Sequence, residues 1–168
     1  MATIKSVLLL AQDIETMAID HETEMTDAMV DEFLGHHETG VLSLARTDEP
    51  YAIPISYGYA SDEREFYMRL VSTPDSEKRA FLESTPRARL VVYDERGSTY
   101  RSVIATGSLE NISPSELTPD QIAQYGEAKR PLFEIWADGK AELDIELYRL
   151  APDSLHGRRT EVDRKTDE

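Results

Sequence analysis

The stretch that decides the fold runs from Pro50 to Leu82, PYAIPISYGYASDEREFYMRLVSTPDSEKRAFL. It predicts two strands, residues 51–59 and 65–71, because each is rich in β-branched and aromatic side chains and a polar turn separates them. A helix over residues 76–84 follows a second polar turn. Pro54 lies inside the first strand and cannot donate a ladder hydrogen bond, so one edge of that strand must be open, bulged or given to a ligand.

The start of the predicted helix carries a functional signal. Asp75 or Ser76 is placed to cap the helix, and Lys78 and Arg79 lie in its first turn. Backbone amides at a helix start attract phosphate groups, and neighbouring cations add charge-assisted hydrogen bonds. The sequence therefore predicts a phosphate-binding site here, although a charged pair on a helix is also typical of a solvated surface.

The flanking sequence predicts further short elements. Thr26 is placed to cap a helix over residues 27–36, and Gly107 interrupts a long strand as a bend or bulge does. Apolar or alternating runs predict the remaining elements: strands over 40–45, 88–93, 100–111 and 141–150, and two helical pieces within 119–137. Six strands joined mostly by hairpins predict a mainly β fold with helices, a small antiparallel barrel with short helices at its rim.

The charge of the chain excludes two classes of partner. Among 168 residues, 18 are basic and 33 are acidic, which gives a formal net charge of −15. Such a surface repels nucleic acids and anionic membranes. The acidic, lysine-poor composition is typical of halophilic proteins, in which salt screens the repulsion between carboxylates. An ordinary acidic cytosolic protein is the alternative, and we expect a cytoplasmic location.

Two further residue types limit the chemistry. The absence of cysteine excludes disulfides, thiolate metal sites and thiol nucleophiles. The adjacent His36 and His37 would point about 100° apart on a helix, so we expect no metal site. No Ser-His-Asp or paired-carboxylate pattern stands out, and the catalytic residues stay unassigned.

We expect one domain over residues 25–160. Residues 1–24 are predicted to be an N-terminal extension, and Met17 or Met25 is an alternative start. The apolar run Val7–Ala11 in this extension is too short for a signal-peptide core or a membrane span. The charged residues 161–168 predict a disordered tail.

Three groups of motifs, taken together, resemble one protein family. They are GVLSLAR with PYAIPISYGY, then FYMRLV with SEKRAFLE and PRARLVVYD, and finally YRSVIATGSLE with LYRLAPDSLHGRR. In this order and spacing, from Met25 to Arg159, they resemble the pyridoxamine 5′-phosphate oxidase-like, FMN-binding split-barrel superfamily. The resemblance implies a six-stranded antiparallel split barrel, usually a homodimer, with FMN bound at the dimer interface.

The resemblance implies that the phosphate of FMN binds at the predicted helix start. Ser76 and Lys78 match the phosphate contacts of the family, and Arg79 would add a second cation. Arg69 would border the phosphate from the end of its strand. Pairing of Arg69 with a nearby carboxylate, Glu65 or Asp62, is an equally good interpretation.

The resemblance also implies contacts with the flavin ring. The strand over residues 53–57 would lie along the isoalloxazine, through backbone groups of Pro54 and Ser56 and with Tyr57 at its end. The remaining residues that would approach the ring or the substrate, some of them from the partner subunit, are Ser102, Val103, Trp136, His156 and Arg158. The alternatives are ordinary strand hydroxyls for the serines, core or dimer packing for Trp136 and a loop position for His156.

Three departures from the family pattern limit the functional prediction. Glu77 stands where pyridoxamine oxidases favour arginine, Ser102 stands where they have glutamine, and the segment His156-Gly157-Arg158 matches their closing segment only in part. The flavin site is therefore better supported than pyridoxal chemistry. The chain is more similar to the general flavin-reductase or nitroimidazole-resistance-like branch.

The sequence thus predicts an FMN-binding flavoprotein, an FMN-dependent oxidoreductase that acts on an undefined small molecule. Flavin enzymes need no protein nucleophile, which agrees with the absence of a catalytic triad. One alternative is a flavin-binding carrier or sensor without turnover. Another is a related barrel that binds deazaflavin or haem.

Overall fold

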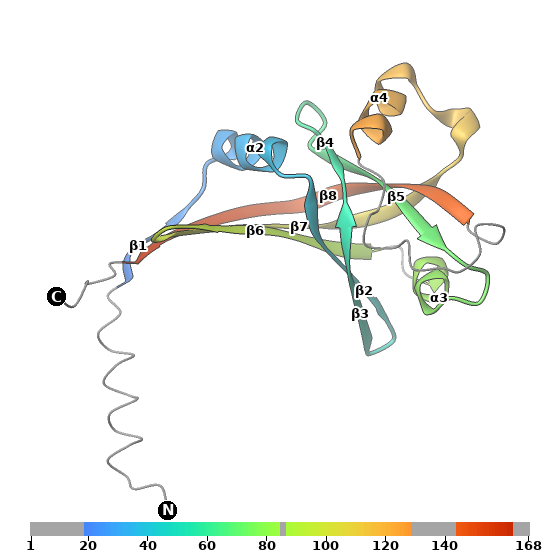
Figure 1. Ribbon diagram of the computed structural model, residues 1–168, viewed down its shortest axis with the longest axis horizontal. Helices are drawn as coiled ribbons and strands as arrows, with labels where there is room; N and C mark the ends of the chain where they lie inside the picture. Colours follow the sequence, from blue (N-terminus) through green and yellow to red (C-terminus); the bar gives the residue numbers. More distant parts are fainter. Residues whose placement is uncertain (1–18, 85–86, 129–143, 163–168) are drawn as a thin grey trace, which may run out of the picture.

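The computed structural model describes residues 19–84, 87–128 and 144–162 (Figure 1). The strands form one antiparallel sheet in the order β3-β2-β6-β7-β8-β5-β4, and β1 pairs with β8 off this path. The strands are β1 (Ile19–Glu24), β2 (Thr39–Arg46), β3 (Glu49–Ser56), β4 (Gly58–Ala60), β5 (Glu65–Ser72), β6 (Arg87–Arg96), β7 (Thr99–Ile112) and β8 (Asp144–Val162). The helices are α2 (Asp27–His36), α3 (Glu77–Ser84) and α4 (Pro119–Glu127), with a 3-10 turn at Pro114–Glu116.

The barrel closes through a bend at Tyr57. The sequence predicted one strand here, but β3 pairs with β2 and β4 pairs with β5. Since β3 and β4 lie at opposite ends of the strand order, the bent strand that contains both joins the two ends of the sheet. With β3 and β4 taken as one strand and β1 set aside, six strands form the ring. The predicted fold class, mainly β with helices at the rim, is confirmed.

The helices form where the sequence predicts them and bury one face each. The Oγ1 atom of Thr26 accepts a hydrogen bond from the backbone N–H of Met29 at 3.3 Å, which confirms the predicted N-cap of α2. The buried residues of α2 are Val30, Phe33 and Leu34, and those of α3 are Phe81 and Leu82. These side chains join the strand residues in one apolar core.

β8 differs most from the prediction. The sequence predicted a strand that ends at Leu150, but β8 continues to Val162. It pairs with β7 along its length, with β5 near its start and with β1 near its end. Its second half contains proline, glycine and several charges in place of apolar alternation, so its stability comes from strands on both edges rather than from local preference.

The sheet extends beyond the predicted domain boundaries, residues 25 and 160, at both ends. Residues 19–24, which the sequence assigned to the extension, form β1, and residues 161 and 162 of the predicted tail belong to β8. The second predicted helical piece, with Trp136, lies outside the described residues. The pairing of β7 with β8 shifts register between Thr106 and Gly107, which confirms the bulge predicted at Gly107.

We predict opposite effects for two glycine-to-alanine substitutions. A Cβ atom at Gly107 would lie 2.1 Å from the carbonyl oxygen of Ala151, so Gly107→Ala should lower the free energy of unfolding by about 1–3 kcal/mol or more. Gly35 lies in α2, and apart from its chain neighbours and the backbone of its own helix no described atom lies within 4 Å of that position. Gly35→Ala should therefore raise the free energy of unfolding by about 0.5–1 kcal/mol. Urea denaturation measures both, and equal effects would contradict the close approach of β7 and β8.

Candidate functional site

The predicted phosphate site begins at a capped helix. The Oγ atom of Ser76 accepts a hydrogen bond from the backbone N–H of Arg79 at 3.3 Å. The backbone N–H of Ser76 in turn donates to the carbonyl of Thr73 at 3.0 Å. Ser76 therefore holds both the turn and the helix start, and the first amides of α3 point away from the helix, where an anion can bind.

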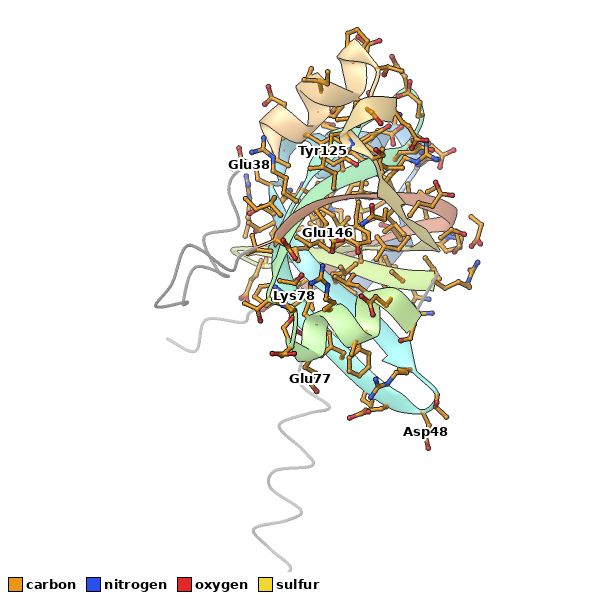
Figure 2. The ribbon with its side chains drawn as sticks, turned by 90° about the vertical axis from the view of Figure 1, so that its right-hand side faces the viewer. Glu38, Asp48, Glu77, Lys78, Tyr125 and Glu146 are labelled. Atoms are coloured by element: carbon orange, nitrogen blue, oxygen red, sulfur yellow. The ribbon has the colours of Figure 1, made fainter. Side chains whose placement is uncertain are left out.

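Both predicted cations contact protein oxygens. Lys78 Nζ donates to the carbonyl oxygen of Val71 at 2.8 Å, so the side chain crosses from α3 to the end of β5. Figure 2 shows Lys78 on the side of α3 that faces the sheet and Glu77 on the opposite side. Arg79 forms ion pairs with Asp144 at 3.0 Å and with Glu83 at 3.6 Å. A phosphate at this position would add to these contacts or replace them.

The sequence prediction missed Ser72, the last residue of β5. Its side chain is buried, with 4% of its surface exposed, and its Oγ atom has no hydrogen-bond partner among the described residues. Buried hydroxyls without a partner are rare, because desolvation of the group is not compensated. The one available sequence signal was a hydroxyl at the end of an apolar strand, directly before the turn to α3. We call Ser72, Ser76, Lys78 and Arg79 the α3 corner.

Arg69 has a different contact from the two that the sequence suggested. Its guanidinium donates to the backbone carbonyl of Tyr125, near the end of α4 (Figure 2 labels Tyr125). A cation at a helix C-terminus satisfies a carbonyl that has no partner within the helix. Gly58 of β4 lies against the same end of α4. A Cβ atom at this position would be 2.5 Å from the carbonyl oxygen of Gln124, so only glycine fits. Arg69 therefore holds α4 against the barrel.

The predicted ring-binding strand has an open edge. β3 is the terminal strand of the order, so no strand pairs with its second edge among the described residues. Pro54 is exposed on this strand and Ser56 is buried, with 6% of its surface exposed. Backbone groups along this edge could bind a planar ligand, as the interpretation of Pro54 anticipated.

The side chain of Tyr57 belongs to the core. It is 2% exposed, and its hydroxyl donates to the carbonyl of Leu34 in α2 at 3.1 Å. Its backbone N–H donates to the carbonyl of Glu38 at 2.9 Å. Burial is the main cause that raises the pKa of Tyr57, so the hydroxyl stays protonated and remains a donor. A ligand contact of Tyr57 is therefore restricted to its backbone.

Ser102 and Val103 point to opposite faces of β7. Val103 is buried in the core, whereas Ser102 lines a groove of about 900 Å³ on the outside of the sheet. The groove also contains His156 and Arg158 from β8, and none of Ser76, Lys78 or Arg79. The structure of one chain therefore does not bring Ser102 and the α3 corner into one cavity.

His156 and Arg158 face carboxylates of β1. Arg158 Nη1 lies 2.9 Å from Glu22 Oε1, and His156 Nδ1 lies 3.8 Å from Glu24 Oε1. These side chains are strongly exposed, so the pairs contribute little to stability. Sequence reasoning placed His156 in a loop or near the substrate; it lies in β8, at the edge of the groove.

The described residues were also searched for a metal-binding cluster and for a membrane-spanning helix. Within them, no group of three or more His, Cys, Asp or Glu side chains could hold a metal ion. Also within them, no helix is long and apolar enough to cross a membrane.

Residues 26–159 match the sequence profile of the family described as pyridoxamine 5′-phosphate oxidase. The chain belongs to this family. The match covers most of the chain, so it confirms the resemblance to pyridoxamine 5′-phosphate oxidase-like split barrels. A search among curated proteins finds no significant match.

Solved structures agree with the family at the level of the fold. A FAD-binding protein from Mesorhizobium loti is 20% identical, with a TM-score of 0.64, and the match covers 82% of this chain and 97% of that chain. A candidate 5-nitroimidazole antibiotic resistance protein from Bacteroides thetaiotaomicron is 11% identical, with a TM-score of 0.58 and coverages of 88% and 93%. A heme-binding protein from Mycobacterium smegmatis is 16% identical, with a TM-score of 0.59 and coverages of 84% and 59%. Members with this fold thus include proteins described as binding different cofactors.

We predict that the hydroxyl of Tyr57 stabilises the fold. Tyr57→Phe removes its hydrogen bond to Leu34 and should lower the free energy of unfolding by about 0.5–1.5 kcal/mol. The control is Ile122→Val on α4, because Ile122 is 56% exposed and should tolerate the loss of one methyl group without measurable effect. Equal urea midpoints for the two variants would show that this bond does not support the bend.

Proposed function

We propose that the chain binds FMN and is an FMN-dependent oxidoreductase that acts on a small molecule. The observation that carries the proposal is the α3 corner. There the buried hydroxyl of Ser72, which has no partner among the described residues, lies on the strand next to a capped helix start and two cations. Hydroxyl, amide and cationic donors are the groups that bind a phosphate monoester. These donors are grouped at one position in a chain whose net charge of −15 otherwise repels phosphate.

The residues of the chain fit the two ends of FMN. Ser72, Ser76, Lys78 and Arg79 would hold the phosphate, and the open edge of β3 would bind the ring through backbone groups near Pro54 and Ser56. When bound, FMN supplies hydride or electron transfer, and the protein orients it and excludes water. The core position of Tyr57 keeps this edge fixed relative to α2. FMN agrees better than FAD with a site built for a terminal phosphate.

A second copy of the chain would complete the site. The strand pairings place Tyr93, Ser102 and Arg158 in one row across β6, β7 and β8, and Val91, Ile104 and His156 in the next. We call this surface the outer face. Tyr93 and Ile104 on it are 69% and 39% exposed, and it carries cations beside Glu22 and Glu24 of β1. A two-fold interface brings the same patch of both copies together, and this surface offers apolar side chains and charges of both signs for it. We propose a homodimer in which Ser102 reaches the partner's flavin.

A flavin-binding carrier or sensor without turnover is the second candidate. It is favoured by the position of His156 and Arg158, which line a groove that contains no residue of the α3 corner, so within one chain they are not placed to transfer protons at the proposed flavin. Oxidation of NADH or NADPH by the FMN-loaded protein, with an electron acceptor present, separates the two candidates. Turnover supports the oxidoreductase, and bound FMN without turnover supports the carrier.

We predict that two substitutions at the α3 corner weaken FMN binding. Ser72→Ala should lower the affinity, yet leave the stability of the FMN-free protein unchanged or raised, because the described part of the chain offers the hydroxyl no partner. Lys78→Ala should weaken binding by about 1–3 kcal/mol, or roughly 5- to 150-fold in Kd. Fluorescence titration with FMN measures both.

The matched control is Arg87→Ala, which removes a cation from an exposed pair with Asp153 and should leave FMN affinity unchanged. Unchanged affinity in both α3-corner variants would place the phosphate elsewhere. A protein that binds haem or a deazaflavin but not FMN would contradict the cofactor proposal itself.

We also predict that Ile104→Glu produces monomers with weak FMN binding, because it puts a charge into the apolar part of the outer face. Ile122→Glu on α4 is the control, since Ile122 is 56% exposed and lies away from this face. Sedimentation velocity measures the state of each variant. A wild-type protein that sediments as an FMN-loaded monomer would contradict the proposed interface.

A further inference from the structure

A second cavity, of about 520 Å³, lies between α2 and the ends of β6, β7 and β8. Figure 1 shows α2 over this end of the long strands, away from α3 and α4. The α2 side contributes the apolar side chains Met25, Met29 and Phe33, and the strands contribute Arg96, Arg101 and Arg159. We call this space the α2 cavity. It shares no lining residue with the α3 corner or with the groove beside Ser102.

Two arginines face each other on the floor of the α2 cavity. The β7–β8 pairing places Arg101 directly opposite Arg159, so both side chains point to the same face of the sheet. Like charges in this arrangement destabilise a sheet unless an anion lies between or beside them. In a chain with a net charge of −15, two adjacent arginines in a cavity are an unusual local excess of positive charge.

Asp94 compensates this charge only in part. Arg101 donates to both of its oxygens, through Nε at 3.0 Å and Nη2 at 2.6 Å. Arg96 lies 3.1 Å from the same carboxylate, and the ring of His37 lies 3.3 Å from it, so one acidic group serves two arginines and a histidine. These neighbours, with Arg101 the largest cause, hold the pKa of Asp94 below its ordinary value.

The positive charge of Arg159 is less fully neutralised than that of Arg101. Its partner is Glu161, two residues along β8, and the side chains are 41% and 43% exposed. An exposed pair of this kind contributes little and exchanges readily with solvent. The other carboxylate at the cavity, Glu32, is exposed. The guanidinium of Arg159 is therefore accessible to a ligand anion.

Arg101 is held in a fixed orientation. Besides its two bonds to Asp94, its guanidinium lies 4.9 Å from the centre of the Phe33 ring. A donor that is already fixed loses little entropy when a ligand binds.

We propose that the α2 cavity binds a small organic anion with an apolar body. Its carboxylate or phosphate group lies between Arg101 and Arg159, and its apolar part contacts Met25 and Met29. The volume falls within the range of small-molecule sites, about 300–1,000 Å³. The site is separate from the α3 corner and does not depend on flavin binding.

Calorimetric titration of the full chain with octanoate, octyl phosphate and 1-octanol tests the proposal. The two anions should bind, and octanol, which has the same apolar chain without charge, should bind at least about tenfold more weakly. Saturation with FMN should leave octanoate binding unchanged. Equal affinities for octanoate and octanol, or no binding of either anion, would overturn the proposal.

A pair of variants tests the position of the site. Arg159→Gln should weaken octanoate binding by about tenfold, the effect of losing one charge-assisted contact. Arg87→Gln changes an equally simple surface ion pair, with Asp153, outside the cavity and should leave the affinity unchanged. Equal affinities for the two variants would place the anion elsewhere on the chain.

Discussion

The bend at Tyr57 is the constraint on which the rest of the structure depends. It lets one strand pair with β2 on one side and with β5 on the other, which closes the barrel. The ring of Tyr57 packs in the core and its hydroxyl bonds to α2, so the bend is fixed by a buried donor rather than by turn chemistry. Because the strand leaves β2 at this point, β3 keeps one edge without a strand partner among the described residues. The proposed ring site is a consequence of that closure.

The second feature of the proposed site is how cations are placed in an acidic chain. Most arginines that the structure describes have a carboxylate beside them, as Arg87 has Asp153 and Arg149 has Glu110. At the α3 corner, Lys78 instead bonds to a backbone carbonyl, and no described residue is a partner for the hydroxyl of Ser72. Local donors can bind a phosphate even where the overall charge repels it, because the attraction acts at contact distance and the repulsion is screened by salt.

Local sequence signals predicted the parts of the fold that form through local contacts. Thr26 caps α2, Ser76 caps α3, and Gly107 marks a bulge, each because a single residue type meets a specific backbone requirement. The second half of β8 was not predictable in this way. Its residues show no apolar alternation, and their pairing partners in β1 and β7 lie far away in the sequence.

In the candidate site, too, the features set by local contacts were predictable and those set by long-range packing were not. The helix start at Ser76 follows from sequence, and so does the presence of Lys78 and Arg79 beside it. The contact of Arg69 with Tyr125 and the burial of Ser72 depend on how α4 packs on β5 and how α3 packs on the barrel, which no local pattern encodes. Strand alternation predicts that Ser102 points outward and Val103 inward. The groove around Ser102 also requires β6, β8 and β1, which lie beside β7 only in the folded chain.

The most direct test of the phosphate site at α3 is a comparison of FMN with riboflavin, which has the same ring without the phosphate. Both should be titrated into the flavin-free protein at the same salt concentration, with flavin fluorescence as the signal. FMN should bind at least about tenfold more tightly than riboflavin, the effect of charge-assisted contacts to a phosphate. Equal affinities for the two flavins, or binding of neither, would contradict the assignment of the α3 corner.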